Sequence, residues 1–414
     1  MLEYDPFSPE AMSDPHRFYP ELRAHHPLYR LEAYHGWALS RFEHCFAVLQ
    51  DPRRFSVVEG PLFVREQVVE PFEDGAIPAA DPARSFSTWD PPGHTRIRRA
   101  MMPRFSPKAI AELEPGMRVL AQTLLDPLLD RGRFDLVRDL AGPFGLANAS
   151  RALGLSLEPD EIGPLFAKIQ RSTERDPGRP GFTPAGMAVQ GEIHQLIQDR
   201  VARTRRSRRV DGAAAGDVMT ALLRFEMDGR GLGDAELATQ LVTLLLGAAE
   251  TIPKVIAGGL REIGRQPGAW QALGRDRART SAVFEEMLRH QGVLQHVGRT
   301  ALEDVDLGGQ CIRRGDRLFL LLQSANRDER EFPDGERFDV HREPSRHLAL
   351  GVGRHHCIGS HLARLEGRVL LEVLLDRVSG FRVVESGLER SASEFQVGHT
   401  RLPIEIEAGG RAPS

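Results

Sequence analysis

One stretch decides what this chain can be: His347-Leu-Ala-Leu-Gly-Val-Gly-Arg-His-His-Cys-Ile-Gly359. Its three glycines have no Cβ atom, so the backbone around Cys357 can turn tightly and approach a flat ligand or a metal centre. From Ser360 onward apolar residues recur at helical spacing, which predicts a helix that begins just after the cysteine. The unpaired N–H groups at that helix start favour the thiolate form of Cys357, the form that binds metals.

Two other interpretations of this stretch stay open at the level of the residues. A lone cysteine in a glycine-rich loop is most often a buried structural side chain. Zinc binding is the sharper alternative, because four histidines crowd the same segment, namely His347, His355, His356 and His361. A single thiolate among them matches none of the usual paired-ligand patterns of zinc sites.

The spacing of glycine, histidine and cysteine in residues 347–359 resembles the haem-binding loop of the cytochrome P450 family. In that family a cysteine thiolate is the proximal ligand of the haem iron, so the resemblance implies this role for Cys357. Leu350 departs from the pattern, because the family usually has phenylalanine seven residues before the cysteine. The implied fold is mostly α with small β-sheets, the cytochrome P450 fold, as a single domain over residues 1–414.

Composition excludes several other classes of protein. With 54 basic and 58 acidic residues, the formal net charge of −4 attracts neither nucleic acid nor an anionic membrane. The three cysteines lie far apart and form no disulfide framework, which fits a reducing compartment. The N-terminus has no signal-peptide pattern, and the most apolar run, residues 241–249, is too short to span a bilayer. We therefore expect a cytoplasmic monomer that binds no nucleic acid and no membrane.

Hydrophobic periodicity predicts the coarse layout of the chain. Residues 15–50 are expected to form a helix, two strand-like pieces and a second helix, and residues 56–89 a long loop rich in proline and glycine. Further helices are predicted over about 94–155, 190–206 and 217–289, and short β-type pieces near 296–300, 310–312, 318–322 and 381–384. The β-rich portion thus combines the N-terminal strands with residues of about 293–322 and 380–405.

A second informative stretch, residues 244–254, is an apolar helical run with Glu250 and Thr251 in its middle. By itself it indicates a helix in which Thr251 bonds to a carbonyl one turn earlier and Glu250 faces solvent. It also resembles the family's oxygen-binding helix, which implies that Glu250 and Thr251 relay protons to iron-bound dioxygen. Pro253 has no N–H, so we expect a kink or widened turn, with the freed Ala249 carbonyl bound to water or to the Thr251 hydroxyl.

Further motifs extend the resemblance over most of the chain. It implies a buried structural network of Glu286, Arg289 and Arg342, although Glu and Arg three positions apart are more often a surface pair. The haem propionates are then expected at His94, Arg98, Arg299 and His355. Other haem contacts are expected from Leu350, Gly351, Ala248, Ile358 and Gly359, and an apolar substrate pocket from Val57, Val58, Phe63, Phe86, Ala248, Leu294, Val297, Phe395 and Val397.

The resemblance as a whole implies a monooxygenase with haem b that inserts one oxygen atom from O2 into a small or medium apolar substrate. No dinucleotide-binding motif is present, so electrons from NAD(P)H are expected through a separate ferredoxin and its reductase. The basic residues expected to attract an acidic carrier are Arg96, Arg99, Arg104 and Arg354. Two alternatives stay open: a peroxide-driven haem enzyme, and a non-catalytic haem protein that binds a gas or another ligand.

Overall fold

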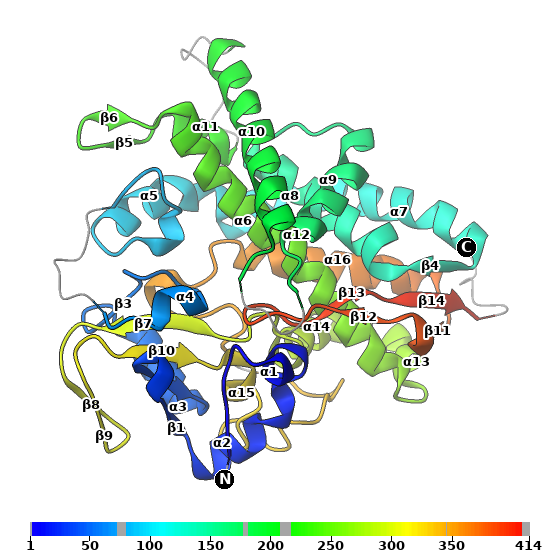
Figure 1. Ribbon diagram of the computed structural model, residues 1–414. Helices are drawn as coiled ribbons and strands as arrows, with labels where there is room; N and C mark the ends of the chain where they lie inside the picture. Colours follow the sequence, from blue (N-terminus) through cyan, green and yellow to red (C-terminus); the bar gives the residue numbers. More distant parts are fainter. Residues whose placement is uncertain (1, 73–79, 177–180, 208–216, 345, 408–414) are drawn as a thin grey trace.

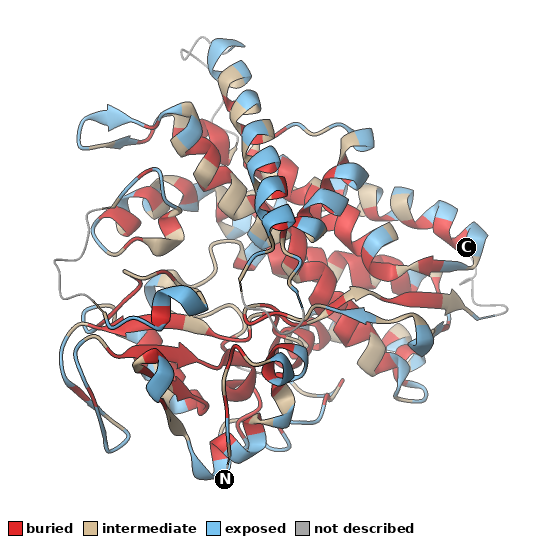
Figure 2. Cartoon of the chain, viewed as in Figure 1, coloured by how far each residue is buried: buried red, intermediate tan, exposed pale blue. Residues whose placement is uncertain are grey.

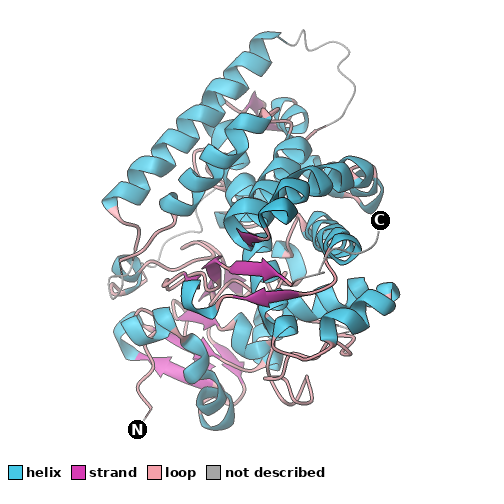
Figure 3. Cartoon of the chain, turned by 90° about the vertical axis from the view of Figure 1, so that its right-hand side faces the viewer, coloured by secondary structure: helices cyan, strands magenta, loops and turns pink. Residues whose placement is uncertain are grey.

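The computed structural model describes residues 2–72, 80–176, 181–207, 217–344 and 346–407. Long helices make up most of the upper part of the molecule in Figure 1, whereas the N-terminal helices and the strands of the largest β-sheet lie in the lower part; Figure 3 shows the same arrangement from the side. The helices are α1 (Pro9–Ser13), α2 (Tyr19–His25), α3 (Phe42–Gln50), α4 (Arg65–Val68), α5 (Gly93–Met101), α6 (Pro107–Ala111), α7 (Glu114–Arg131), α8 (Gly142–Leu153), α9 (Pro159–Ser172), α10 (Pro184–Ser207), α11 (Val218–Leu223), α12 (Asp234–Gly264), α13 (Ala269–Arg275), α14 (Thr280–His290), α15 (Leu322–Ala325) and α16 (Ser360–Arg377).

The strands form one larger sheet and several small ones. The five-stranded sheet has the order β1 (Leu28–Leu31), β2 (Gly36–Leu39), β10 (Arg317–Leu320), β7 (Val297–Ala301), β3 (Phe55–Ser56). A three-stranded sheet has the order β11 (Phe381–Val383), β14 (Pro403–Ile406), β4 (Arg133–Asp135), and the two-stranded pairs are β5 (Glu226–Met227) with β6 (Arg230–Gly231), β8 (Val305–Leu307) with β9 (Gln310–Ile312), and β12 (Glu389–Arg390) with β13 (His399–Arg401). In the larger sheet β10 runs parallel to β2 and antiparallel to β7.

Helix α12 is the central element of the helical part (Figure 1). It starts where the Gly233 N–H donates to Glu236 Oε2 at 2.7 Å, which satisfies one of the free donors at a helix start. The helix is long and apolar enough to cross a membrane, but 67% of its most apolar window is buried inside the protein. It is therefore a core helix. Figure 2 shows that buried residues, coloured red, gather in the middle of the molecule, where this helix lies.

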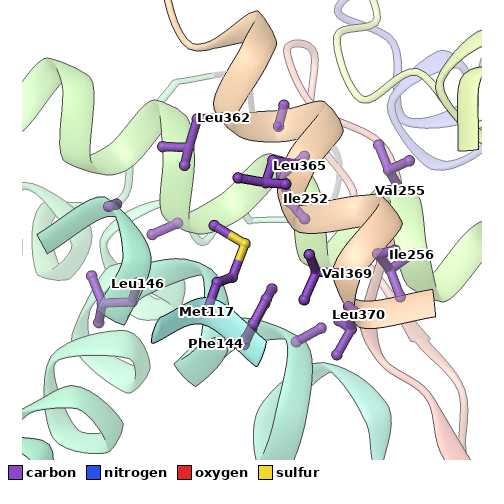
Figure 4. Packing of buried hydrophobic residues seen from close by; sticks show 14 of the residues in the cluster. Met117, Phe144, Leu146, Ile252, Val255, Ile256, Leu362, Leu365, Val369 and Leu370 are labelled. Atoms are coloured by element: carbon purple, nitrogen blue, oxygen red, sulfur yellow. The ribbon is translucent and has the colours of Figure 1, made fainter. Parts of the chain in front are cut away.

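Helix α16 packs across α12 in the largest hydrophobic core. Figure 4 shows the side chains of this contact: Ile252, Val255 and Ile256 from α12, Leu362, Leu365, Val369 and Leu370 from α16, and Met117, Phe144 and Leu146 from α7 and α8. Burying such aliphatic side chains is worth roughly 1.5–3 kcal/mol each. This core fixes the start of α16, and with it the loop that carries Cys357, relative to the middle of α12.

The coarse layout predicted from periodicity is largely confirmed. Helix α16 begins at Ser360, and the predicted strand near residues 318–322 is β10. Several elements were not predicted: strand β4 and the hairpin β5–β6 interrupt predicted helical runs, and helices such as α1 and α9 lie outside every predicted helical segment. The loop over 56–89 contains helix α4, and its residues 73–79 lie outside the described part. A single domain over 1–414 stays a prediction.

Candidate active site

The loop before α16 holds Cys357 in a fixed backbone turn. The Cys357 N–H donates to the Leu350 carbonyl at 2.8 Å, and the side chain is half-buried. Gly353 has a φ of 71°, and a Cβ atom there would lie 2.4 Å from the Leu49 carbonyl oxygen of α3. Only glycine fits this position, because a side chain would collide with the backbone that supports the loop.

Electrostatics around Cys357 correct one prediction. Burial raises the pKa of the Cys357 thiol, and the Gly359 N–H and the arginines Arg98 and Arg364 only partly oppose it. The helix start alone therefore does not make Cys357 a thiolate, because desolvation outweighs the favourable N–H group and charges. A bound metal cation would supply the missing stabilisation, since a coordinating thiol is deprotonated.

In the middle of α12, one strip of accessible residues lies next to buried positions. Leu244, Ala248 and Thr251 are partly exposed and Gly247 is exposed, whereas Leu245 and the residues 249–250 are buried. These four residues are three or four positions apart and share one face of the helix. A Cβ atom added to Gly247 would meet no atom within 4 Å, so the strip borders open space. Ala248, expected beside the haem, lies in it.

The predicted distortion at Pro253 is not present as a widened turn. Helix α12 continues as an α-helix from Asp234 to Gly264, through the proline. The Thr251 hydroxyl donates to the Gly247 carbonyl at 2.8 Å, so the predicted bond from Thr251 to the Ala249 carbonyl is wrong. The hydroxyl prefers the carbonyl four residues earlier because the helical geometry brings it within reach. Water at the Ala249 carbonyl stays a prediction.

Glu250 does not face solvent, which corrects the simplest interpretation of this helix. Its residue is 6% exposed, and its carboxylate lies among Thr173, Lys254 and Gln396 rather than beside Thr251. Buried carboxylates are found paired or at work, because an isolated one is strongly destabilised. Glu250 and Thr251 are therefore neighbours in sequence that point to different surroundings.

Four basic side chains gather beside the cysteine loop. His94 and Arg98 lie one turn apart on α5, Arg299 lies on β7, and His355 lies two residues before Cys357. The His94 and His355 rings stack with centroids 4.0 Å apart, and Arg98 donates to the carbonyl of His356. Segments far apart in the sequence thus meet at one place, as the resemblance predicts.

These four side chains lack acceptors for much of their donor capacity. Nε2 of His94 and Nε2 of His355 are buried without a partner, and within the described ranges Arg299 hydrogen-bonds only to the carbonyl of Gly298, at 2.7 Å. Burial and neighbouring positive charge lower the pKa of His94 to about 4 and that of His355 to about 2. Burial lowers the pKa of Arg299 to about 10.

Such a cluster fits a ligand that carries carboxylates. Buried donors without acceptors cost free energy, and charge-assisted bonds to an anion remove that cost. Haem has two propionates, so the donor set fits the edge of this cofactor, and Cys357 on the same loop fits its iron. His347, in contrast, bonds to Glu285 at 3.1 Å, and no three His, Cys, Asp or Glu side chains of the described part gather as a metal site.

The residues expected to line an apolar pocket are placed unevenly. Phe86 and Val57 are buried, and the Phe86 ring stacks over His94 with centroids 6.4 Å apart. The segments of Leu294 and Phe395 are joined, because Leu294 pairs with Gln396 in a β-bridge. Partly exposed positions in this set are Val58, Leu294, Val297 and Phe395, whereas Val397 is buried.

Phe63 does not join these side chains. Its ring contacts Phe319 at a centroid distance of 4.8 Å inside the N-terminal core, against Gly298. An added Cβ at Gly298 would lie 2.7 Å from that ring, so Phe63 is enclosed by the sheet. Its large apolar side chain gives the same sequence signal in a core as in a pocket.

The network of Glu286, Arg289 and Arg342 is assembled in the structure. Arg289 makes two bonds to Glu286, at 2.6 and 2.7 Å, and donates to the carbonyls of Asn326 and Gly335. Arg342 Nε lies 3.3 Å from Glu286 Oε1. The side chains of Glu286 and Arg289 are fully buried, so this pair is part of the core rather than an ordinary surface contact.

Sequence reasoning missed a second charged group behind the cysteine loop. Glu285 accepts hydrogen bonds from His347 and from Arg364 of α16, and it borders a cavity of about 250 Å³. Burial opposes ionisation of Glu285, but these bonds outweigh it and hold its pKa to about 2. The run Glu285-Glu286 was visible in the sequence, yet only the second acid matched a motif.

Comparison with known proteins gives a consistent result. A sequence profile described as "Cytochrome P450" matches residues 184–383. The chain is 31% identical to "Putative cytochrome P450 123" of Mycobacterium tuberculosis, with 98% of each chain covered, and 31% identical to "Linalool 8-monooxygenase" of Pseudomonas putida, with 94% and 95% covered. The solved structure of cytochrome P450 CYP109Q5 from Chondromyces apiculatus superposes with a TM-score of 0.80 at 29% identity, covering 98% of each chain.

Proposed function

The chain belongs to the cytochrome P450 family, and from this premise we propose that it is a monooxygenase with Cys357 as iron ligand and a small or medium apolar substrate. The enzyme class, an oxidoreductase of the P450 monooxygenase type, follows from the named relatives. The observation that carries the residue assignment is the set of buried donors without acceptors on and beside the Cys357 loop. Cytoplasmic location and a monomeric state stay predictions.

Each side chain has a stated task in this proposal. When bound, haem supplies the iron chemistry that activates O2. Cys357 Sγ binds the iron, and His94, Arg98, Arg299 and His355 bind the propionates, which satisfies their free donors. Backbone and side-chain contacts to the ring are assigned to Leu350, Gly351, Ala248, Ile358 and Gly359.

Proton delivery is assigned to Thr251 and Glu250. Thr251 lies on the accessible strip of α12. There its hydroxyl can accept a proton from water and donate one to the O2 substrate. Glu250 is the buried acid next to Thr251 in the sequence, and we propose that its carboxylate turns toward Thr251 to replace the proton that Thr251 gives up. The small side chains of Gly247 and Ala248 would leave room for the cofactor and O2, since a Cβ atom added at Gly247 meets no atom within 4 Å.

The substrate is proposed to be a terpenoid, steroid or aromatic compound. The supporting observation is the apolar set that includes Val57, Phe86, Leu294, Val297 and Val397, since small-molecule sites are mostly apolar. Relatives in this family are named for such substrates: the linalool enzyme above, and "Steroid C26-monooxygenase" of Mycobacterium tuberculosis, 31% identical over 76% of this chain and 78% of the relative. Binding is tested with a panel of these compounds by the spin-state shift of the haem.

Electrons are proposed to come from a separate ferredoxin. Arg99, Arg354 and the 40% exposed Met102 lie around a hollow of about 720 Å³ that also reaches His356 beside the cysteine. Such a basic rim with an apolar side chain suits an acidic carrier. Arg96 is less available, because it is 2.8 Å from Asp228. Turnover with ferredoxin should fall as ionic strength rises, and insensitivity to salt excludes this docking role.

The first experiment is the absorption spectrum of the reduced protein with carbon monoxide, repeated with Cys357→Ser. We expect the strongly red-shifted Soret band of thiolate-ligated haem in the wild type and its loss in the variant. A wild-type protein that binds haem without this band contradicts the assignment of Cys357. A colourless protein contradicts haem binding and returns the histidine-rich loop to the zinc interpretation.

A peroxide-driven reaction is the second candidate. It is favoured by one observation: Glu250 is held by Lys254 and Gln396, and Thr251 bonds to its own helix, so neither is ready to pass a proton. Product formed with NADH and carriers, compared with product formed with hydrogen peroxide alone, separates the two reactions. A haem protein that forms product in neither assay is a binding protein.

A further inference from the structure

A buried cluster of four charged side chains lies at one face of α12. Glu250 and Lys254 come from α12, Arg175 follows α9, and Glu394 lies in the segment between β12 and β13. The exposed fraction of each of these side chains is 7% or less, and their charges cancel. Because buried charges persist only when they are paired, the cluster is one electrostatic unit.

The contacts of Glu250 occupy both of its carboxylate oxygens. Oε1 accepts from the Thr173 hydroxyl at 2.5 Å and lies 3.6 Å from Lys254 Nζ. Oε2 accepts from Gln396 Nε2 at 3.4 Å, and the Gln396 Oε1 accepts from Lys254. Glu250, Lys254 and Gln396 therefore form a closed ring of polar contacts.

The backbone is shaped to admit Lys254 to this ring. Glu250 and Lys254 are four positions apart, so they share one helix face. Opposite them, Gly398 has a φ of 142°, and a Cβ atom there would lie 2.8 Å from the Cβ of Lys254. The segment that carries Gln396 is fixed, because the Val397 N–H donates to the Val293 carbonyl at 2.9 Å.

Thr251 takes no part in the ring. It is one residue along the helix, about 100° around its axis, and its hydroxyl donates to Gly247 at 2.8 Å. Both oxygens of Glu250 are engaged on the other side. A proton can pass from Glu250 toward Thr251 only after the carboxylate leaves Lys254 and Gln396.

We propose that Lys254 is a positioning residue for proton delivery: together with Gln396 it holds the Glu250 carboxylate turned away from Thr251 until the contact with Gln396 opens. This inference rests on the proposed function, because proton delivery to the O2 substrate has a role only in a monooxygenase. Once released, the Glu250 carboxylate would take up a proton from solvent and pass it to Thr251, which regenerates the carboxylate.

The charged groups that face Glu250 come from three elements. Lys254 is on its own helix, Arg175 follows α9, and Glu394 lies before β13. Thr173 and Gln396 are uncharged donors to the carboxylate. Burial lowers the pKa of Lys254, the charge of Glu250 opposes this, and Arg175 adds to the lowering. The charge of Glu250 thus supports the ammonium form of Lys254.

The test is Lys254→Met, which removes the cation and keeps the length of the side chain. Without its partner the buried Glu250 should take up a proton more readily, which shifts the pH profile of turnover upward by about one pH unit or more. Infrared spectroscopy reads the same change without turnover, as a protonated carboxyl band at neutral pH. Adding Glu250→Gln should remove the band, and Lys254→Arg should restore the wild-type profile.

A matched control is Lys168→Met, because Lys168 pairs with Glu192 at 2.7 Å on the exposed face of α9. This variant should match the wild type in the pH profile and the infrared band. If Lys254→Met does not fold, Gln396→Leu opens the ring and keeps both charges. It should then reduce the solvent isotope effect on NADH-driven turnover of a panel compound that gives product.

The outcomes separate this inference from the proposed function. A wild-type protein without the carbon monoxide band or without product overturns the proposed function, whatever the variants do. A wild-type protein that forms product, with Lys254→Met unchanged in the pH profile and the carboxyl band, overturns the role of Lys254. An unchanged isotope effect in Gln396→Leu overturns the release step.

Discussion

Two buried arginines of this molecule have opposite surroundings. Arg289 on α14 is fully buried and has acceptors on several sides: the Glu286 carboxylate and three backbone carbonyls. Arg299 on β7 is 4% exposed, and among the described residues it bonds to the Gly298 carbonyl alone. The sequence motifs give both arginines equal weight. The difference shows which one is complete within the protein and which one is built for a ligand.

Desolvation explains the difference between the two arginines. An arginine that leaves water loses its hydration, and a carboxylate with well-placed carbonyls restores most of that loss. Within the fold, Arg289 regains hydrogen bonds that replace its lost hydration, so its role is structural. Arg299 does not regain such hydrogen bonds, and burial lowers its pKa to about 10. A propionate would complete its surroundings, which couples this part of the fold to the cofactor.

Arg289→Met should have the largest effect on this comparison. It leaves the buried Glu286 carboxylate without its main partner and with only the longer contact to Arg342, which costs roughly 3–5 kcal/mol of unfolding free energy. We expect a large loss in urea midpoint for the protein with and without haem. A variant within about 1 kcal/mol of the wild type, which is about the error of such extrapolations, contradicts the structural role.

Arg299→Leu should act in the opposite direction in the haem-free protein. Removing a buried cation without a carboxylate partner relieves an electrostatic cost on the order of 1–3 kcal/mol, so the haem-free protein should become more stable. The same variant should release haem faster to a scavenging protein. Lower stability of the haem-free variant means that Arg299 already has a partner within the fold, and breaks the comparison.

Glu285→Gln tests an intermediate case behind the cysteine loop. The pKa of Glu285 is held to about 2, below the ordinary value, so its contribution is present above about pH 4.5 and is lost as pH falls toward 2. With partial solvent exposure, a loss of about 2 kcal/mol is expected at pH 7. The stability curves of variant and wild type should converge between pH 4.5 and 2, and parallel curves contradict this.

Arg342→Gln should give the smallest effect. Its guanidinium meets Glu286 at 3.3 Å and is more exposed than Arg289, at 15% of its side chain. Because the remaining partner, Arg289, still neutralises Glu286, we expect a loss of about 1 kcal/mol. A loss as large as that of Arg289→Met indicates that the three residues act as one cooperative unit, measurable in a double-mutant cycle.

Local patterns carried much of the sequence prediction. The helix after the cysteine, the strand near residue 318 and the meeting of His94 with His355 all follow from periodicity or from motif matches. Strand β4 could not be predicted, because three residues rich in charge carry no β pattern, and its pairing with β14 is what orders it. Pro164 lies inside α9, and because proline disfavours helix interiors, this helix is hard to predict from residue propensities.

Contacts across the chain were beyond prediction for a different reason. Lys254 follows a proline in a buried helix, and nothing near it in sequence shows that Gln396 accepts its bond. Phe63 illustrates the converse, since an apolar ring reads alike in a core and in a pocket. Such roles depend on distant segments that only the folded chain brings together.

The parallel pairing of β2 with β10 has a consequence for how the protein is made. Gly36 pairs with Arg317, about 280 positions later, and the Gly353 turn rests on Leu49 of α3. Contacts between such remote segments are slow to form, because the intervening chain must be ordered first. On the ribosome β1 and β2 can pair with each other, but the other edge of β2 stays open until β10 has emerged. Cys357 lies later in the chain than β10, so the cysteine loop also emerges after it, and incomplete chains carry an exposed strand edge that favours aggregation.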